Sequence, residues 1–183
     1  AASDVYKRQE DIHMTTGADA LNEATILAKK GRRVQLETVI GQDDAGKFIQ
    51  AHCDDAGIMV RDACIKKDEK TGMNIVLVEQ DGTRSFLTNP HGTLRSLKVE
   101  HIQMPFPESA KIVCFASIFV FPKIGPDKLV QIFSQAKMQG KIVCADMTKR
   151  KKGETLEDMA EAFSYIDYLF PNCLLYTSPS PRD

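Results

Sequence analysis

The sequence has few cysteines, no surplus of positive charge and no long hydrophobic run. Its five cysteines form no Cys-x-x-Cys pair, which argues against a metal site or a disulfide framework and favours reduced core residues. Lys and Arg number 24 against 25 Asp and Glu, so the basic excess typical of nucleic-acid-binding proteins is missing. No apolar run approaches the ~18 residues of a membrane span. These absences predict a cytoplasmic protein that binds neither nucleic acid nor membrane.

Two common nucleotide-binding motifs are also missing. No Gly-x-Gly-x-x-Gly occurs, so the dinucleotide fingerprint is absent. The segment GQDDAGK, residues 41–47, fits the first seven positions of a P-loop, but Phe48 stands where a Ser or Thr hydroxyl must bind magnesium. Two carboxylates also occupy positions where phosphates would lie, and the P-loop interpretation is therefore rejected.

The most informative stretch, residues 16–46, sets a polar loop at the start of a helix and repeats this arrangement after a strand. Gly17 and Ala18 predict a turn that a ligand can approach closely, and Asp19 can cap the helix that follows, which Gly31 ends. An apolar strand then leads to Gly41, and Asp43 or Asp44 starts a second helix that Gly57 ends. Two such loops at one edge of a sheet predict a pocket, although Asp19 and Asp43 could serve only as helix-capping residues.

The remaining sequence predicts a parallel sheet with a small appendage. Residues 58–65, 73–79 and 83–88 have strand patterns, and Asp81-Gly82 is typical of a tight hairpin turn. We expect these three strands to be antiparallel and to form a lid. From residue 111 strands alternate with helices, at 112–116, 126–138, 141–145, 156–163 (capped by Thr155) and 168–170, which predicts parallel βαβαβ pairing.

Ligands of open α/β sheets bind beyond the carboxyl ends of the strands. In this chain those ends are residues 41–44, Ser117, residues 146–150 and Asn172. We therefore expect these four places to converge.

The segments GADALNEA and VIGQDDAGKF together resemble the first signature of the ribokinase-like (pfkB-type) carbohydrate kinases. The resemblance continues through TGMNIVLVEQDGTRSFLTNPHGTLRSL, which is similar to the lid of that family, and through KIVCFASIF, IVCADMTKRK and YLFPN. It covers nearly all of residues 11–172. The fold that it implies is a three-layer α/β/α sandwich with a mostly parallel sheet and a small β-lid at about residues 58–90, incomplete at both ends.

The resemblance also implies site residues. Gly17, Asp19 and Asn22 would contact sugar hydroxyls, and Gly41 and Asp43 would form the opposite wall. Arg150 and Asn172 would belong to the region that holds phosphate and Mg²⁺, with no residue of the chain as a direct metal ligand. The implied activity is ATP-dependent phosphorylation of a sugar, and a homodimer through the lid is possible.

The chain departs from the family pattern in several places. Ala18 replaces the second glycine of the usual pair, and Thr148 stands where Asn is frequent. The GAGD motif, which supplies the catalytic base and the amides that stabilise phosphate charge, does not occur. We therefore expect a kinase parent protein and an inactive fragment without a catalytic residue. A nucleoside kinase of the same superfamily and a non-catalytic sugar-binding or regulatory protein remain the alternatives.

The two ends of the chain can be encoded by one nucleotide string and by nearly its reverse complement. Residues 1–9, AASDVYKRQ, fit a string that ends in AGATGTGTATAAGAGACAG, and residues 173–183, CLLYTSPSPRD, fit one that begins with nearly its reverse complement. The string is identified as the end sequence of transposon-based sequencing adapters. We therefore predict non-native tails at residues 1–9 and 173–183 around a partial kinase domain at residues 10–172.

Overall fold

The structure is a computed structural model that describes residues 11–89, 91–148, 155 and 157–171. Arg150, Asn172 and both predicted tails lie outside these described residues. Within the described ranges, no helix has the length and apolar character needed to cross a bilayer. The helices are α1 (Asp19–Lys29), α2 (Asp44–Ala56), α3 (Pro126–Met138) and α4 (Ala160–Ser164). The strands are β1 (Val34–Leu36), β2 (Ile40–Gly41), β3 (Ile58–Val60), β4 (Ile65–Lys66), β5 (Asn74–Val78), β6 (Arg84–Thr88), β7 (Ile112–Ile118), β8 (Ile142–Met147) and β9 (Tyr168–Pro171).

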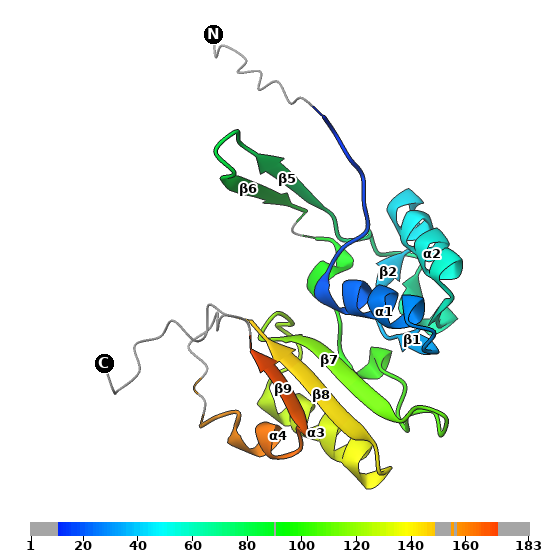
Figure 1. The fold of residues 1–183 in the computed structure, drawn as a ribbon, viewed down its shortest axis with the longest axis vertical. Helices are drawn as coiled ribbons and strands as arrows, with labels where there is room; N and C mark the ends of the chain where they lie inside the picture. The colour runs from blue at the N-terminus through cyan, green and yellow to red at the C-terminus, as the bar shows by residue number, and fades with distance from the viewer. Residues whose placement is uncertain (1–10, 90, 149–154, 156, 172–183) are drawn as a thin grey trace.

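The first half of the chain builds two short parallel sheets with helices α1 and α2 beside them (Figure 1). Strand β1 pairs with β3 and β2 pairs with β4, both in parallel. Leu21 and Ala24 bury one face of α1, as the helical spacing predicts, and they pack with Cys53 of α2 into a small core. Helix α1 also contacts β7, so it connects the two halves of the chain.

The second half forms a three-stranded parallel sheet in the order β7-β8-β9. Helices α3 and α4 lie on one face of this sheet (Figure 1) and supply the main hydrophobic core, in which Phe133 and Ile118 are fully buried. Pro126 stands at the first position of α3, and Gly140 follows the helix with a φ of 67°. The βαβαβ prediction is confirmed.

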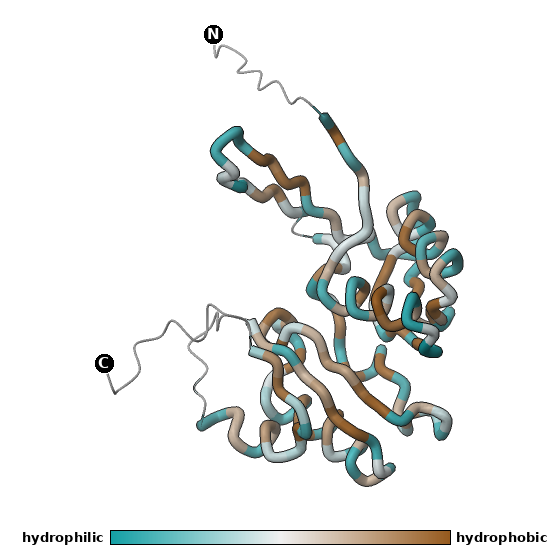
Figure 2. The backbone as a smooth tube through the Cα atoms, viewed as in Figure 1, coloured by the Kyte–Doolittle hydropathy of each residue, from teal (hydrophilic) through white to brown (hydrophobic). Residues whose placement is uncertain are grey.

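The predicted hairpin stands away from the sheets, as Figure 1 shows. Strands β5 and β6 pair in antiparallel register, and Gly82 in the turn between them has a φ of 84°. Apolar side chains on both strands face solvent, with Ile75 59% and Phe86 61% exposed, and Figure 2 shows the hydrophobic colour along the hairpin. The hairpin expected around Asp81-Gly82 is therefore present, and part of its apolar face is uncovered.

Two predictions about neighbouring segments are wrong. The single strand expected at residues 58–65, antiparallel within the lid, is instead two short strands, β3 and β4, separated by a 3-10 turn at Asp62–Cys64. Each of the two pairs in parallel with a strand of the first half. Helix α4 is only 5 residues long and begins at Ala160, because Thr155 and Asp158 bond to each other in a turn before it. The α/β class and the mostly parallel pairing are confirmed, although the parallel strands fall into three separate sheets.

Candidate functional site

Asp19 contacts the end of β7 and does not cap its helix. It is the first residue of α1, and the capping position belongs to Ala18, which makes no side-chain cap. The Asp19 carboxylate instead accepts a hydrogen bond, through Oδ2, from the hydroxyl of Ser117. The capping role considered from the sequence is therefore wrong, and the carboxylate lies where a ligand at the strand ends would meet it.

Ser117 occupies an irregular place in β7. The pairing of β7 with β8 shifts register between Phe115 and Ile118, and Ser117 has a φ of 59°, which is uncommon for a residue with a side chain. Its backbone N–H donates to Oδ1 of Asp146 on β8, and its side chain is buried. Ser117 and Asp146, two of the four places that the rule for strand ends names, thus lie together, and Asp19 of α1 joins them.

Burial and neighbouring charges raise the pKa of two carboxyl groups at this place, Glu23 and Asp146. Burial, followed by the charges of Asp146 and Asp19, raises the pKa of Glu23. Burial also raises the pKa of Asp146, with a further contribution from Asp19, while the N–H of Ser117 opposes the rise. Such a cluster is rich in hydrogen-bond acceptors, so it suits a ligand that brings hydroxyl donors.

Gly17 and Asn22 lie beside Asp19 with open space around them. An added Cβ on Gly17 would meet no heavy atom within 4 Å, and the side chain of Asn22 is exposed. In the described part of the chain, the Asn22 amide group makes no hydrogen bond. Asn22 and Oδ1 of Asp19 are therefore available to a ligand.

Gly41 and Asp43 belong to a different set of contacts. Asp43 caps α2 by accepting from the Gly46 N–H at 2.9 Å, and it also accepts from the N–H and the hydroxyl of Thr71 at 2.9 and 2.5 Å. The Gly41 N–H donates to the Thr71 hydroxyl at 2.9 Å. The side-chain hydrogen bond from Thr71, more than any other contact, lowers the pKa of Asp43 to about 2. These contacts establish the capping role of Asp43, whereas its place in a sugar site with Gly17, Asp19 and Asn22 stays a prediction.

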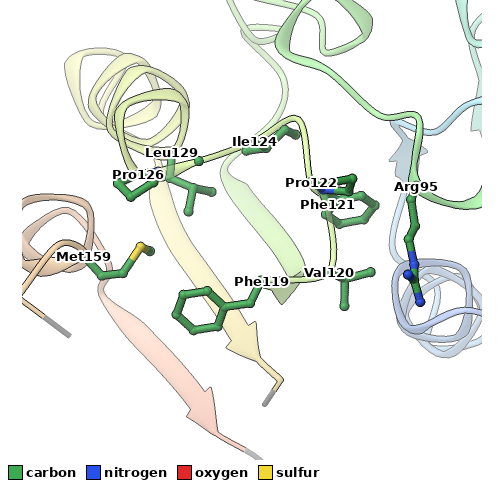
Figure 3. A pocket seen from close by; sticks show the side chains of 10 residues that line it. Arg95, Phe119, Val120, Phe121, Pro122, Ile124, Pro126, Leu129 and Met159 are labelled. Atoms are coloured by element: carbon green, nitrogen blue, oxygen red, sulfur yellow. The ribbon is translucent and has the colours of Figure 1, made fainter. Parts of the chain in front are cut away.

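A hollow of about 100 Å³ opens just after Ser117, and Figure 3 shows its lining. Phe119, which has a φ of 76°, and Phe121 line it together with Leu129 and Met159, and Arg95 stands at one side. This volume is well below the ~300 Å³ of a typical ligand pocket. The hollow therefore suits one substituent of a ligand whose main contacts are elsewhere.

Sequence reasoning missed Thr71 and Glu23. Glu23 follows Asp19 by four residues, so helical periodicity could have placed both carboxylates on one face of α1. Thr71 had no such signal, because its partner Asp43 lies 28 positions earlier. Arg150 and Asn172 lie outside the described residues. Across the described ranges, no group of three His, Cys, Asp or Glu side chains is arranged to hold a metal ion.

Ala18 has backbone angles that favour glycine, with a φ of 76° and a ψ of 145°. Ala18→Gly should therefore raise the free energy of unfolding by about 1 kcal/mol, because relief of the strain exceeds the entropy that glycine adds to the unfolded chain. Urea denaturation measures the change. Ala20→Gly, inside the same helix, is the matched control and should cost about 1 kcal/mol; a lower stability for Ala18→Gly would contradict the strain.

Comparison with solved structures identifies relatives of the same fold. Fructokinase from Xylella fastidiosa superposes with a TM-score of 0.70 at 24% identity, over 91% of this chain and 56% of that one. Its structure with bound ATP gives a TM-score of 0.66 at 25% identity, over 83% and 50%. A PfkB protein from Polaromonas sp. gives 0.71 at 21% identity, over 88% and 57%, and adenosine kinase from Schistosoma mansoni in complex with adenosine gives 0.64 at 20% identity, over 83% and 45%.

These likenesses show a ribokinase-like α/β fold, and the chain spans about half the length of these relatives. A family model, that of the pfkB family carbohydrate kinases, matches residues 2–173. The match includes residues 2–9 and Cys173, which belong to the predicted tails, and the adapter interpretation of the tails stays a prediction. With nearly the whole chain matched by one model, the protein belongs to the pfkB family of carbohydrate kinases.

Proposed function

We propose that this chain is part of an ATP-dependent kinase that transfers the γ-phosphate of ATP to a hydroxyl of a sugar. The observation that carries the proposal is the convergence of Asp19, Ser117 and Asp146 at the carboxyl ends of β7 and β8. A likeness to a fructokinase structure with bound ATP supports the choice of phosphoryl donor. In this proposal the described residues bind and orient the sugar.

A carboxylate and an amide that lie close together are well suited to bind the hydroxyls of a sugar. A sugar presents neighbouring hydroxyls, each of which can donate and accept, so a carboxylate and an amide on one helix turn can bind two of them at once. Oδ1 of Asp19 would accept from one hydroxyl, and the amide of Asn22 would bind the next. Gly17 would let the ring approach the backbone, since no atom stands where its Cβ would be.

The chemical step itself needs residues that are not among those described. Arg150 and Asn172, which we propose for the phosphate and Mg²⁺ region, lie outside the described residues, and the sequence has no GAGD motif. Mg²⁺ would neutralise charge on the transferred phosphate. Because the base and the phosphate-binding amides are missing, we expect this chain by itself to show no ATP-dependent phosphorylation, in contrast to the full-length parent.

Asn22→Ala in the parent should weaken sugar binding by about 1–3 kcal/mol, the cost of one lost buried hydrogen bond. The side chain is exposed in the free protein, so the melting temperature should stay unchanged. KM measured by ADP release, over pentoses, hexoses, sugar acids and sugar phosphates, tests the effect. Lys29→Ala at the far end of α1 is the control, and an unchanged KM for Asn22→Ala would remove Asn22 from the site.

A nucleoside kinase is the second candidate, and the hollow beyond Ser117 favours it. Phe119 and Phe121 line that hollow, and aromatic rings can stack on a nucleobase. Adding adenosine and other nucleosides to the same assay separates the two functions, because turnover of nucleosides alone supports this candidate. Sugar binding without any turnover by the parent would instead indicate a non-catalytic sugar-binding protein.

We further propose that the protein acts in the cytoplasm and that the β5–β6 hairpin forms a lid. Its exposed apolar residues, among them Ile75 and Phe86, suit closure over a sugar or pairing with the hairpin of a second copy. Sedimentation of the parent distinguishes a monomer from such a homodimer.

A further inference from the structure

We propose that Ser117 is a positioning residue that fixes the Asp19 carboxylate for sugar binding, and that Asp146 acts through Ser117. The inference rests on the proposed function, because it assigns a purpose to the contact between Ser117 and Asp19. Neither residue needs to touch the sugar. The argument starts from the irregular pairing of β7.

The register in which β7 pairs with β8 places a β-bulge at Ser117. Phe115 pairs with Ala145 and Ile118 pairs with Met147, so two residues of β7, Ala116 and Ser117, lie opposite the single residue Asp146. A bulge of this kind leaves one residue unpaired and redirects a side chain, and bulges are frequent beside active sites. In this protein the redirected side chain is that of Ser117.

The side chain of Asp146 stabilises the bulge. The bulge deprives the Ser117 N–H of a regular partner in the parallel ladder, and Oδ1 of Asp146 accepts that hydrogen. A buried N–H without a partner would be costly. Asp146 therefore holds the backbone of Ser117 in the one conformation that aims its hydroxyl toward α1.

A bulge needs no hydroxyl, and glycine would adopt a φ of 59° with less strain. Serine at this position is strained and buried, at 4% exposure. What serine adds is its hydroxyl, which donates to Oδ2 of Asp19. A strained conformation that places a polar group on a ligand-facing residue is typical of preorganised sites.

The consequence for the sugar is a carboxylate held in one orientation. With Oδ2 bonded to Ser117, the Asp19 carboxylate keeps one orientation at the start of α1 only as long as that bond persists. Preorganisation of this kind lowers the entropy lost on binding. Removing the hydroxyl should therefore weaken binding even where it leaves the fold intact.

Ser117→Gly is the decisive variant, because glycine relieves the backbone strain while it removes the hydroxyl. The melting temperature of this chain should stay the same or rise. Amide hydrogen exchange of Asn22, whose N–H closes the first turn of α1 on the Ala18 carbonyl at 3.0 Å, should nevertheless become several-fold faster. In the full-length parent, KM for the sugar should rise about tenfold while kcat changes less than threefold. A purely structural role of Ser117 would not combine higher stability with weaker binding.

Four further variants complete the design. Ser117→Ala should raise KM equally but with lower stability than Ser117→Gly, because alanine keeps the strain. Asp146→Asn keeps an oxygen acceptor for the Ser117 N–H and should preserve KM better than Asp146→Ala. Ser164→Ala is the control, since the Ser164 hydroxyl donates to the Glu161 carbonyl of its own helix, at 2.6 Å, and to no other residue that the structure describes.

The outcomes separate this inference from the proposed function. A parent that phosphorylates no sugar refutes the proposed function, whatever the exchange data show. A parent that phosphorylates a sugar with the same KM in wild type and Ser117→Gly overturns the inference alone. Unchanged hydrogen exchange at the start of α1 in Ser117→Gly overturns it as well.

Discussion

Gly46→Ala should lower the free energy of unfolding by about 3 kcal/mol, although alanine is the better helix former by about 1 kcal/mol. A Cβ on Gly46 would lie 1.9 Å from the carbonyl oxygen of Gly41, and neither backbone can yield without moving α2. Gly41→Ala should cost as much, because its Cβ would lie 2.2 Å from the carbonyl oxygen of Glu69. The two glycines allow β2, the start of α2 and the loop that contains Thr71 to approach one another.

Urea denaturation measures the loss of unfolding free energy in Gly46→Ala and Gly41→Ala. Gly17→Ala is the control, because no heavy atom stands within 4 Å of the added Cβ, and its stability should change by no more than about 0.5 kcal/mol. A higher urea midpoint for Gly46→Ala, as helix propensity alone suggests, would contradict the close approach.

Asp43→Ala should lower the free energy of unfolding by about 2–3 kcal/mol at pH 7. It removes the cap of α2 and both hydrogen bonds from Thr71, and the estimate combines typical values for caps and charged hydrogen bonds, reduced because the side chain is partly exposed. Asp44→Ala is the matched control: the side chain of Asp44 is 99% exposed and, among the described residues, pairs with Lys47 alone, so its loss should matter little.

The cost of Asp43→Ala should also depend on pH. The folded protein holds the pKa of Asp43 at about 2, below its ordinary value of 3.8. The unfolded chain therefore takes up a proton first as pH falls, and the stabilisation by the carboxylate, complete above pH ~4, disappears toward pH 2. Denaturation of wild type and Asp43→Ala across this range should show that the difference between their free energies of unfolding becomes smaller as the pH falls. A difference that stays constant would rule out stabilisation by the ionised carboxylate.

Local signals in the sequence predict the elements that are determined locally. Gly57 and Gly140 end their helices, Pro126 begins α3, and Asp81-Gly82 forms the hairpin turn, because these residues restrict or extend the backbone conformations nearby. Strands β3 and β4 have the same apolar composition as an antiparallel strand would, and only their pairing with β1 and β2 reveals the parallel direction. Pairing partners far apart in sequence leave no local signal.

In the candidate site, too, some features have a signal in the local sequence and others depend on distant parts of the chain. The rule for strand ends predicted that Ser117 and Asp146 would converge, and it needed only the positions of the strands. The bulge in β7 could not be predicted, because nothing in the segment CFASIF favours a positive φ at Ser117. The role of Asp19 was ambiguous for a related reason: an Asp before a helix suits a cap and a ligand contact equally, and only the position of β7 decides between them.

The hydrogen bond between Asp19 and Ser117 joins residues 98 positions apart in the chain. Contacts of such long sequence separation close late in folding, after local helices and hairpins have formed, because a large loop must be ordered before they can stabilise anything. A sugar bound across this contact would stabilise only the finished fold. It would therefore slow unfolding without accelerating folding. The concentration of substrate in the cell would then help to set how long each copy of the folded protein survives.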